Sequence, residues 1–145
     1  MKYNFEVIKE ENGYSAHCLE IKGLRTQGDT WEELESNISE VFALWFSDVT
    51  DYEEIPKPSP DVHSENVRSF SVPLDVAFRL ELYWYRKEKG LSQREIAKHL
   101  GYKDNSIRAY QKIERGISVP SLTVLDQITK QVPELRQRIG VHLLG

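Results

Sequence analysis

The chain has 145 residues, of which 39% are hydrophobic and 29% are charged, and its formal net charge is −4. This length fits one ordinary domain or two small ones, and no apolar stretch approaches the roughly 20 residues that span a bilayer. The N-terminal residues lack the apolar core of a secretion signal, and the single cysteine, Cys18, excludes an internal disulfide framework. We therefore expect a cytoplasmic protein with no membrane segment.

The average charge hides two oppositely charged halves. Residues 1–72 hold six Lys and Arg against fifteen Asp and Glu, a net charge of −9. Residues 73–145 hold thirteen Lys and Arg against eight Asp and Glu, a net charge of +5. A basic half suits a polyanion and an acidic half suits a basic surface, so we expect the two halves to face different partners.

The first residues alternate like a half-buried strand, with Tyr3, Phe5 and Val7 on one face. Asn12-Gly13 follows and indicates a hairpin, because both residues tolerate positive φ. A turn closed there pairs Val7 with Cys18 and places both on the core face.

A short third strand is expected near residues 24–27, and the clearest helix of this half comes next. Thr30 is its predicted N-cap, and Glu33 completes a capping box. The apolar stripe expected to face the sheet consists of Leu34, Ile38, Val41, Phe42 and Trp45. The outer face carries Glu32, Glu35 and Glu40.

Residues 53–66 form a predicted proline-rich connector. Prolines at positions 56, 58 and 60 favour extended polyproline geometry and exclude a central strand. Alternation returns at residues 67–72, which we expect to add one more strand to the sheet. The N-terminal domain is therefore assigned to residues 1–72, with the order β-β-β-α-β.

The apolar period is helical from residue 73 onward, and residues 73–145 are predicted to form an all-α domain of five helices. The first helix ends at Gly90, and the second begins at Ser92, which with Glu95 makes another capping box. Further helices are expected around Tyr110, after Pro120 and after Pro133. The predicted fold class is α+β.

Several spaced elements of this half resemble one known family. They are Leu91-Ser92-Gln93, the small residue Ala97, Leu100-Gly101, Ile113-Glu114-Arg115-Gly116, and Pro120-Ser121-Leu122 with Leu125. They resemble the Cro/repressor-type helix-turn-helix of the xenobiotic-response-element class. The resemblance implies that a recognition helix enters the major groove of DNA. Thirteen positions separate Gly101 from Glu114, about three more than is common in this class, so a longer turn is expected.

The simplest alignment makes Ser106 the N-cap of the recognition helix. Arg and Gln can bond bidentately to guanine and adenine, whereas Lys more often contacts phosphate. The candidate DNA-binding residues are Gln93, Lys103, Asn105, Ser106, Ile107, Arg108, Gln111, Lys112 and Arg115. The alternative is that these residues form a solvated helix face.

A single helix-turn-helix contacts only a few base pairs, so a homodimer or higher oligomer on double-stranded operator DNA is expected. The last helix, residues 134–144, is one candidate interface through Leu135, Ile139 and Leu143. The alternative is that these side chains pack within their own domain.

The N-terminal half has a resemblance of its own. Its markers are the Tyr3-x-Phe5 strand, Asn12-Gly13-Tyr14, Gly23-Leu24 with Thr26-Gln27-Gly28, Thr30 with Glu32-Glu33, and Ile55-Pro56 with Pro58-Ser59. Together they resemble the HicB antitoxin family over residues 1–60. The resemblance implies a partial ribonuclease-H-like fold, a HicA-type toxin that cleaves mRNA as partner, and repression of the shared operon. The candidate toxin-binding residues are Glu32, Glu35, Glu40, Glu53, Glu54, Pro56 and Pro58.

No catalytic residue, metal site or cofactor is expected. The carboxylates lie mostly on one helix face or in the connector, the four histidines are scattered, and Cys18 and His17 point to opposite faces of a strand. Two alternatives stay open. One is a stand-alone transcriptional repressor that senses a small ligand in a pocket lined by Trp31 and Trp45, and the other is a Mg²⁺-dependent nuclease.

Overall fold

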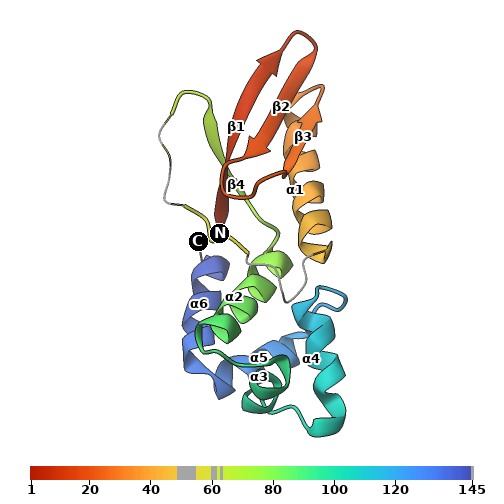
Figure 1. The fold of residues 1–145 in the computed structure, drawn as a ribbon, viewed down its shortest axis with the longest axis vertical. Coiled ribbons are helices and arrows are strands. Elements are labelled where there is room, and N and C mark those ends of the chain that lie inside the picture. The colour runs from red at the N-terminus through yellow and green to blue at the C-terminus, as the bar shows by residue number, and fades with distance from the viewer. Residues whose placement is uncertain (49–54, 60–61, 63, 145) are drawn as a thin grey trace. The chain divides into compact units, whose positions relative to one another are not determined.

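The computed structural model describes residues 1–48, 55–59, 62 and 64–144, without the side chains of residues 143 and 144 (Figure 1). The chain divides into two compact units, Met1–Pro73 and Leu74–Gly145, here named the sheet unit and the helical unit. The fold is α+β, as predicted. Two candidate toxin-binding residues, Glu53 and Glu54, lie outside the described residues, as does Pro60 of the connector.

The sheet unit is a four-stranded antiparallel sheet with one helix packed on it (Figure 1). Its strands are β1 (Lys2–Glu10), β2 (Gly13–Cys18), β3 (Arg25–Gly28) and β4 (Val67–Ser71), and their spatial order is β3-β2-β1-β4. The helix is α1 (Trp31–Asp48). The predicted order of elements, β-β-β-α-β, is confirmed.

The helix α1 buries Leu34, Ile38, Phe42 and Phe46, which are spaced four residues apart. The sequence instead placed Val41 and Trp45 in this stripe, and both are half-buried in the structure. A strict four-residue spacing keeps the inner stripe narrow and moves those two side chains to its border. Phe42 packs on the rings of Tyr3 and Phe5.

The predicted pairing register of the first hairpin is wrong by two residues. Val7 pairs with Ala16, and Cys18 pairs with Phe5, because Glu11 and Asn12 form the turn. Gly13 is already the first residue of β2 and has a φ of +152°, and a Cβ there would lie 2.5 Å from the Gly28 carbonyl oxygen. A shift of two leaves every side chain on its predicted face.

The helical unit contains, in its described residues, five α-helices and one 3₁₀ turn. They are α2 (Leu74–Glu88), α3 (Gln93–His99), η1 (Asp104–Ser106), α4 (Ile107–Glu114), α5 (Leu122–Gln131) and α6 (Pro133–Leu144). Leu82, Ile96, Leu100 and Tyr110 are completely buried in their common core. Leu74 and Leu122 are exposed, and each is the first residue of its helix.

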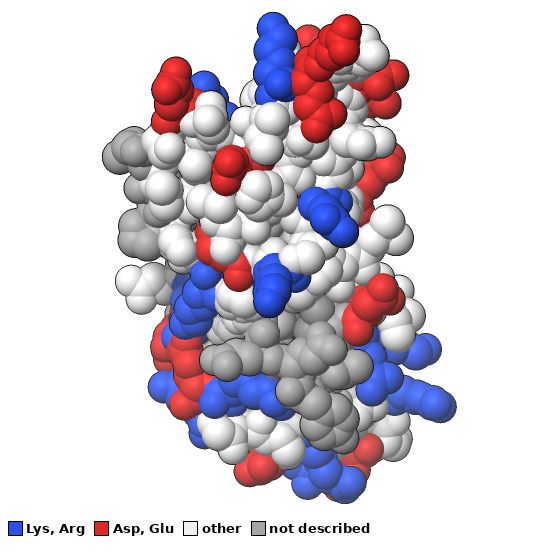
Figure 2. Space-filling model, turned by 45° about the horizontal axis from the view of Figure 1, so that its top comes forward, with Lys and Arg blue, Asp and Glu red and all other residues white. Residues whose placement is uncertain are grey.

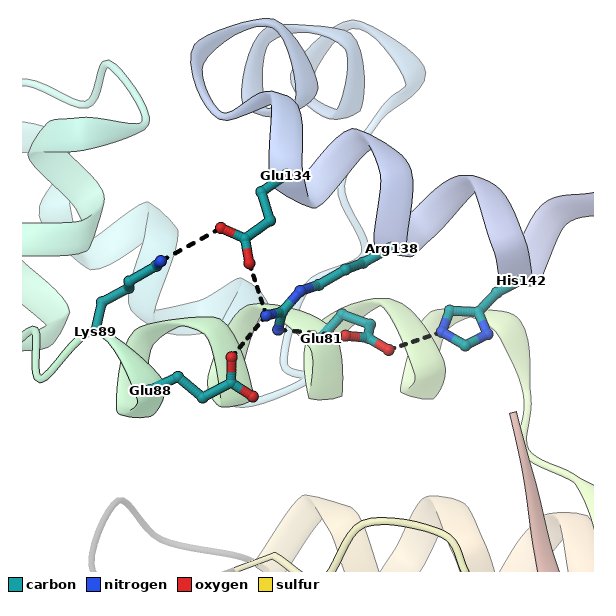
Figure 3. A network of polar contacts seen from close by, with 6 residues as sticks. All are labelled: Glu81, Glu88, Lys89, Glu134, Arg138 and His142. Atoms are coloured by element: carbon teal, nitrogen blue, oxygen red, sulfur yellow. Dashed lines mark hydrogen bonds and ion pairs between the residues drawn. The ribbon is translucent and has the colours of Figure 1, made fainter. Parts of the chain in front are cut away.

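The helix α6 packs within the helical unit through two kinds of contact. Leu135 and Ile139 are buried in the core, so the structure favours the packing alternative for these two residues, whereas the side chain of Leu143 is not described. On another side of α6, Arg138 Nη2 lies 2.6 Å from Glu88 Oε2, and His142 Nε2 lies 2.9 Å from Glu81 Oε1 (Figure 3). These ion pairs and hydrogen bonds attach α6 to α2.

A buried ion pair joins α2 to the end of α4. Arg86 Nη2 lies 2.6 Å from Glu114 Oε1, and the two side chains are only 4% and 3% exposed. Arg86 Nε also donates to Glu114, and the Tyr110 hydroxyl donates to Glu114 Oε2. The desolvation of both charges is offset only while this bonding is complete, so the network fixes where α4 lies against α2.

Replacing Glu114 by Ala leaves the Arg86 guanidinium buried without its carboxylate partner. We expect the free energy of unfolding of the helical unit to fall by about 3–5 kcal/mol. Urea titration followed by helical circular dichroism measures this change. Glu134→Ala is the matched control because its carboxylate is 42% exposed, and it should cost no more than about 1 kcal/mol. Equal unfolding midpoints for the two variants would contradict the structural role of Glu114.

Candidate nucleic-acid interface

A capping box formed by Ser92 and Glu95 determines where the helix α3 begins, with Ser92 as its N-cap. The Glu95 N–H donates to Ser92 Oγ, and the Ser92 N–H donates to Glu95 Oε1, each over 3.1 Å. The backbone bond from Ser92, together with its side-chain bond, lowers the pKa of Glu95. This confirms the predicted capping box and places Gln93 in the first turn of α3.

The longer turn predicted after Gly101 contains the 3₁₀ turn η1. Ser106 precedes α4, as predicted, but its hydroxyl does not cap the helix and donates to Asn105 Oδ1 over 3.2 Å. Tyr102 attaches the turn to the core through its ring contact with Tyr110, at 5.9 Å between centroids. Burial of its hydroxyl raises the pKa of Tyr102.

The helix α4 has one buried and one exposed face. Tyr110 is completely buried and Ile113 nearly so, in agreement with the sequence alignment. The exposed positions Arg108, Lys112 and Arg115 and the half-buried Gln111 follow the spacing i, i+4, i+7 and i+3. This spacing places the four side chains on one side of the helix.

The side chains of Gln93 and Gln111 connect α3 to the outer face of α4. Gln111 Nε2 donates to Gln93 Oε1 over 3.2 Å. A glutamine recognises adenine with one amide N–H and its carbonyl oxygen, and the amide of Gln111 carries a second N–H besides the one given to Gln93. The contact therefore orients Gln111 while leaving its amide suited to a base edge.

The remaining predicted DNA-binding residues lie in the turn after α3 and at the first residue of α4. Lys103 and Asn105 are exposed in the turn, whereas Ser106 and Ile107 are half-buried at the start of α4. The nine candidates are thus confined to the first turn of α3, the turn before α4, α4 itself and the residue that follows it: Gln93, Lys103, Asn105, Ser106, Ile107, Arg108, Gln111, Lys112 and Arg115.

Two basic residues of α3 were missed by the sequence reasoning. Arg94 and Lys98 are exposed, and both contact the carboxylate of Asp104 in the turn. Their spacing of four residues indicates a shared helix side and could have identified them. They extend the basic surface from α4 onto α3.

The candidate toxin-binding glutamates Glu32, Glu35 and Glu40 are all exposed on α1. Glu35 accepts a hydrogen bond from Trp31 Nε1 over 2.8 Å. Glu33 has a structural role, since its N–H donates to Thr30 Oγ1 and its carboxylate accepts from the Asp29 N–H. In a capping box the Glu33 carboxylate would accept from the N–H of the N-cap residue, Thr30. Here it accepts from the N–H of the preceding residue, Asp29.

The connector residues Pro56 and Pro58 are half-buried on the sheet unit. The Tyr3 hydroxyl donates to the Pro56 carbonyl oxygen over 2.7 Å, and the Ser59 N–H donates to Glu20 Oε2 over 3.1 Å. The two tryptophans proposed to line a ligand pocket pack on different partners. Trp31 contacts Tyr14 and Phe70, whereas Trp45 contacts Phe46.

The surfaces of the two units differ in charge. On the face drawn in Figure 2, acidic side chains gather at the hairpin end of the sheet unit, and Lys and Arg side chains are spread over the helical unit. Within the described residues, no group of three or more His, Cys, Asp or Glu is placed to hold a metal ion. None of the described helices has the length and apolar character needed to cross a bilayer.

Comparison with known proteins assigns both a domain and a family. Residues 82–131 match the helix-turn-helix family HTH_3, a range that includes α3, η1, α4 and α5. The chain is also similar to UPF0150 protein ssr1765 of Synechocystis sp. (strain ATCC 27184 / PCC 6803 / Kazusa), with 37% identity over 59 residues. That match covers 38% of this chain and 75% of the relative. The chain therefore belongs to the UPF0150 family and carries a helix-turn-helix DNA-binding domain in its C-terminal half.

Proposed function

We propose that this DNA-binding regulator is an antitoxin that represses its own operon. In this proposal the helical unit binds double-stranded operator DNA, and the sheet unit binds a HicA-type toxin and blocks its access to mRNA. The observation that carries the DNA-binding part is the bond between Gln93 and Gln111, beside the exposed Arg108. The bond orients Gln111 from the neighbouring helix α3, and Gln111 lies on α4, the helix that also carries Arg108; both side-chain types are suited to base recognition.

The charge of the helical unit supports the same proposal. Its net charge of +5 favours a polyanion, and Lys103, Lys112 and Arg115 are exposed around the recognition helix. Contacts to phosphate orient a protein on the duplex, and contacts to base edges discriminate between sequences. We assign the first role to these three residues and the second to Arg108 and Gln111.

The antitoxin part is supported by family and charge. The UPF0150 family is HicB-like, and a net charge of −9 over residues 1–72 suits a basic RNA-cleaving partner. The exposed glutamates Glu32, Glu35 and Glu40 present three of its fifteen acidic side chains on one helix. Complementary fields speed the association of two proteins. Inhibition is steric in this proposal, and the sheet unit performs no catalysis.

We also propose that the chain acts as a homodimer or higher oligomer, because a palindromic operator has two half-sites. Leu135 and Ile139 pack in the core of their own unit, so the dimer contact must use other residues. Ile117, Val119 and Leu122 are 67%, 72% and 85% exposed; the first two lie between α4 and α5, and Leu122 is the first residue of α5. These three apolar residues are the positions to test by substitution.

The variant Arg108→Ala with Gln111→Ala tests the recognition helix. Each bidentate base contact is worth about 1–3 kcal/mol of discrimination, so operator binding should be lost at concentrations that saturate the wild type. The measurement is a gel shift with a duplex from upstream of the gene that encodes this chain. Arg136→Ala with Gln137→Ala, a pair of exposed residues on α6, is the matched control and should bind normally. An unchanged shift for the α4 variant would refute the assignment of its outer face.

The variant Glu32→Gln, Glu35→Gln, Glu40→Gln tests the toxin-binding surface. Removing these charges should slow association with the product of the adjacent short basic reading frame by about tenfold or more at low salt. Stopped-flow mixing at two ionic strengths measures the rate. Glu10→Gln, Glu11→Gln, Glu65→Gln removes the same charge from other exposed positions of the sheet unit. Equal rates for both triple variants would exclude α1 as the toxin-binding surface, and no binding by the wild type would favour the stand-alone repressor.

A further inference from the structure

An acidic residue lies within the basic surface of the helix-turn-helix. Asp104 is the only Asp or Glu between Glu95 and Glu114, a stretch that holds four Lys and Arg. Its Oδ1 lies 3.0 Å from Lys98 Nζ and 3.4 Å from Arg94 Nη2. An exposed carboxylate on a surface proposed to bind a polyanion repels the phosphates, so its presence there needs a physical explanation.

The fold does not provide that reason. The side chains of Arg94, Lys98 and Asp104 are 65%, 50% and 67% exposed, and exposed ion pairs contribute only about 0–1 kcal/mol to stability. The turn is held by other contacts. The Tyr102 N–H donates to the Ala97 carbonyl oxygen over 2.9 Å, and the Ser106 N–H donates to the Lys103 carbonyl oxygen over 2.8 Å.

The position of the ion pairs connects them to the DNA-binding surface. Arg94 follows Gln93, whose side chain bonds to Gln111 of the recognition helix, and Lys98 lies one turn further along α3. Asp104 lies between Lys103 and Asn105, two of the candidate DNA-binding residues. A carboxylate and a phosphate accept hydrogen bonds from the same N–H groups of Arg and Lys.

We propose that Asp104 competes with DNA phosphates for Arg94 and Lys98. In the free protein the two cations form ion pairs with Asp104, and in the complex they contact phosphate instead. The inference rests on the proposed operator binding and adds a restraint on affinity to it. Because phosphate contacts carry no sequence information, Asp104 weakens binding to every sequence alike and leaves discrimination to Arg108 and Gln111.

The competition also affects how steeply the affinity for DNA falls with salt concentration. Cations that are already neutralised by Asp104 attract fewer phosphates, so fewer counterions are released when DNA binds. Each additional phosphate contact steepens the slope of log K against log salt by about 0.9. The hydrogen bond from Lys98 lowers the pKa of Asp104, so the carboxylate stays ionised at neutral pH.

The test compares Asp104→Asn with Asp126→Asn in the full chain. Asp126 makes an equally exposed ion pair with Lys130 on α5, at 2.8 Å, so both substitutions change the net charge by the same amount. The probes are a fluorescent duplex from upstream of the gene and a shuffled duplex of equal length and composition. Binding is measured by anisotropy at several salt concentrations, after thermal melts have shown that both variants are folded.

Asp104→Asn should bind both duplexes about five- to tenfold more tightly at 0.1 M salt, with a slope steeper by about one to two. The ratio of its affinities for the two duplexes should equal that of the wild type. Asp126→Asn should change either affinity by less than about twofold. Adding Arg94→Ala and Lys98→Ala to Asp104→Asn should remove the gain.

Two results would overturn the proposal while the proposed function stands. In both, the wild type binds the upstream duplex. In the first, Asp104→Asn has wild-type affinity and slope. In the second, it binds more weakly, which would show that Asp104 orients Arg94 and Lys98 for DNA. Failure of the wild type to bind either duplex would refute the operator-binding proposal and this inference together.

Discussion

The buried bond between Arg86 and Glu114 determines how the DNA-binding face is presented. Two charges excluded from water are tolerated only in a nearly complete hydrogen-bonding arrangement, so α4 has one stable position against α2. With Tyr110 and Glu114 directed inward, the helical repeat turns Arg108 and Lys112 outward. Gly116 then ends the segment with a φ of +74°, where a Cβ would lie 2.3 Å from the Arg79 guanidinium.

The sheet unit uses its charged residues differently. Glu20 is its main structural carboxylate, since it accepts hydrogen bonds from the N–H and side-chain amide of Asn4 and from the N–H of Ser59. The glutamates Glu32 and Glu40 of α1 remain exposed. Within this unit, one carboxylate therefore holds the connector to the sheet, and others face solvent where a basic partner can reach them.

The sequence predicted those features that depend on local periodicity and capping. Ser92 with Glu95 gave the start of α3, and the alignment placed Tyr110 and Ile113 inside. The hairpin register was predicted wrongly because Glu11 and Asn12, not Asn12 and Gly13, form the turn, and Gly13 is already the first residue of β2, close to Gly28 of β3. The bonds of Gln93 to Gln111 and of Asp104 to Arg94 also join separate elements, and only the path of the longer turn brings them together.

We propose that one chain binds two macromolecules through two separate units. Hydrogen exchange of the full chain tests it most directly, once with the upstream duplex and once with the protein encoded by the adjacent short basic reading frame. We expect DNA to slow exchange at residues 93–115 and to leave α1 unchanged, and the basic protein to slow exchange in the sheet unit, including α1. Protection of the sheet unit by DNA without protection of residues 93–115, or protection by the basic protein confined to the helical unit, would contradict it.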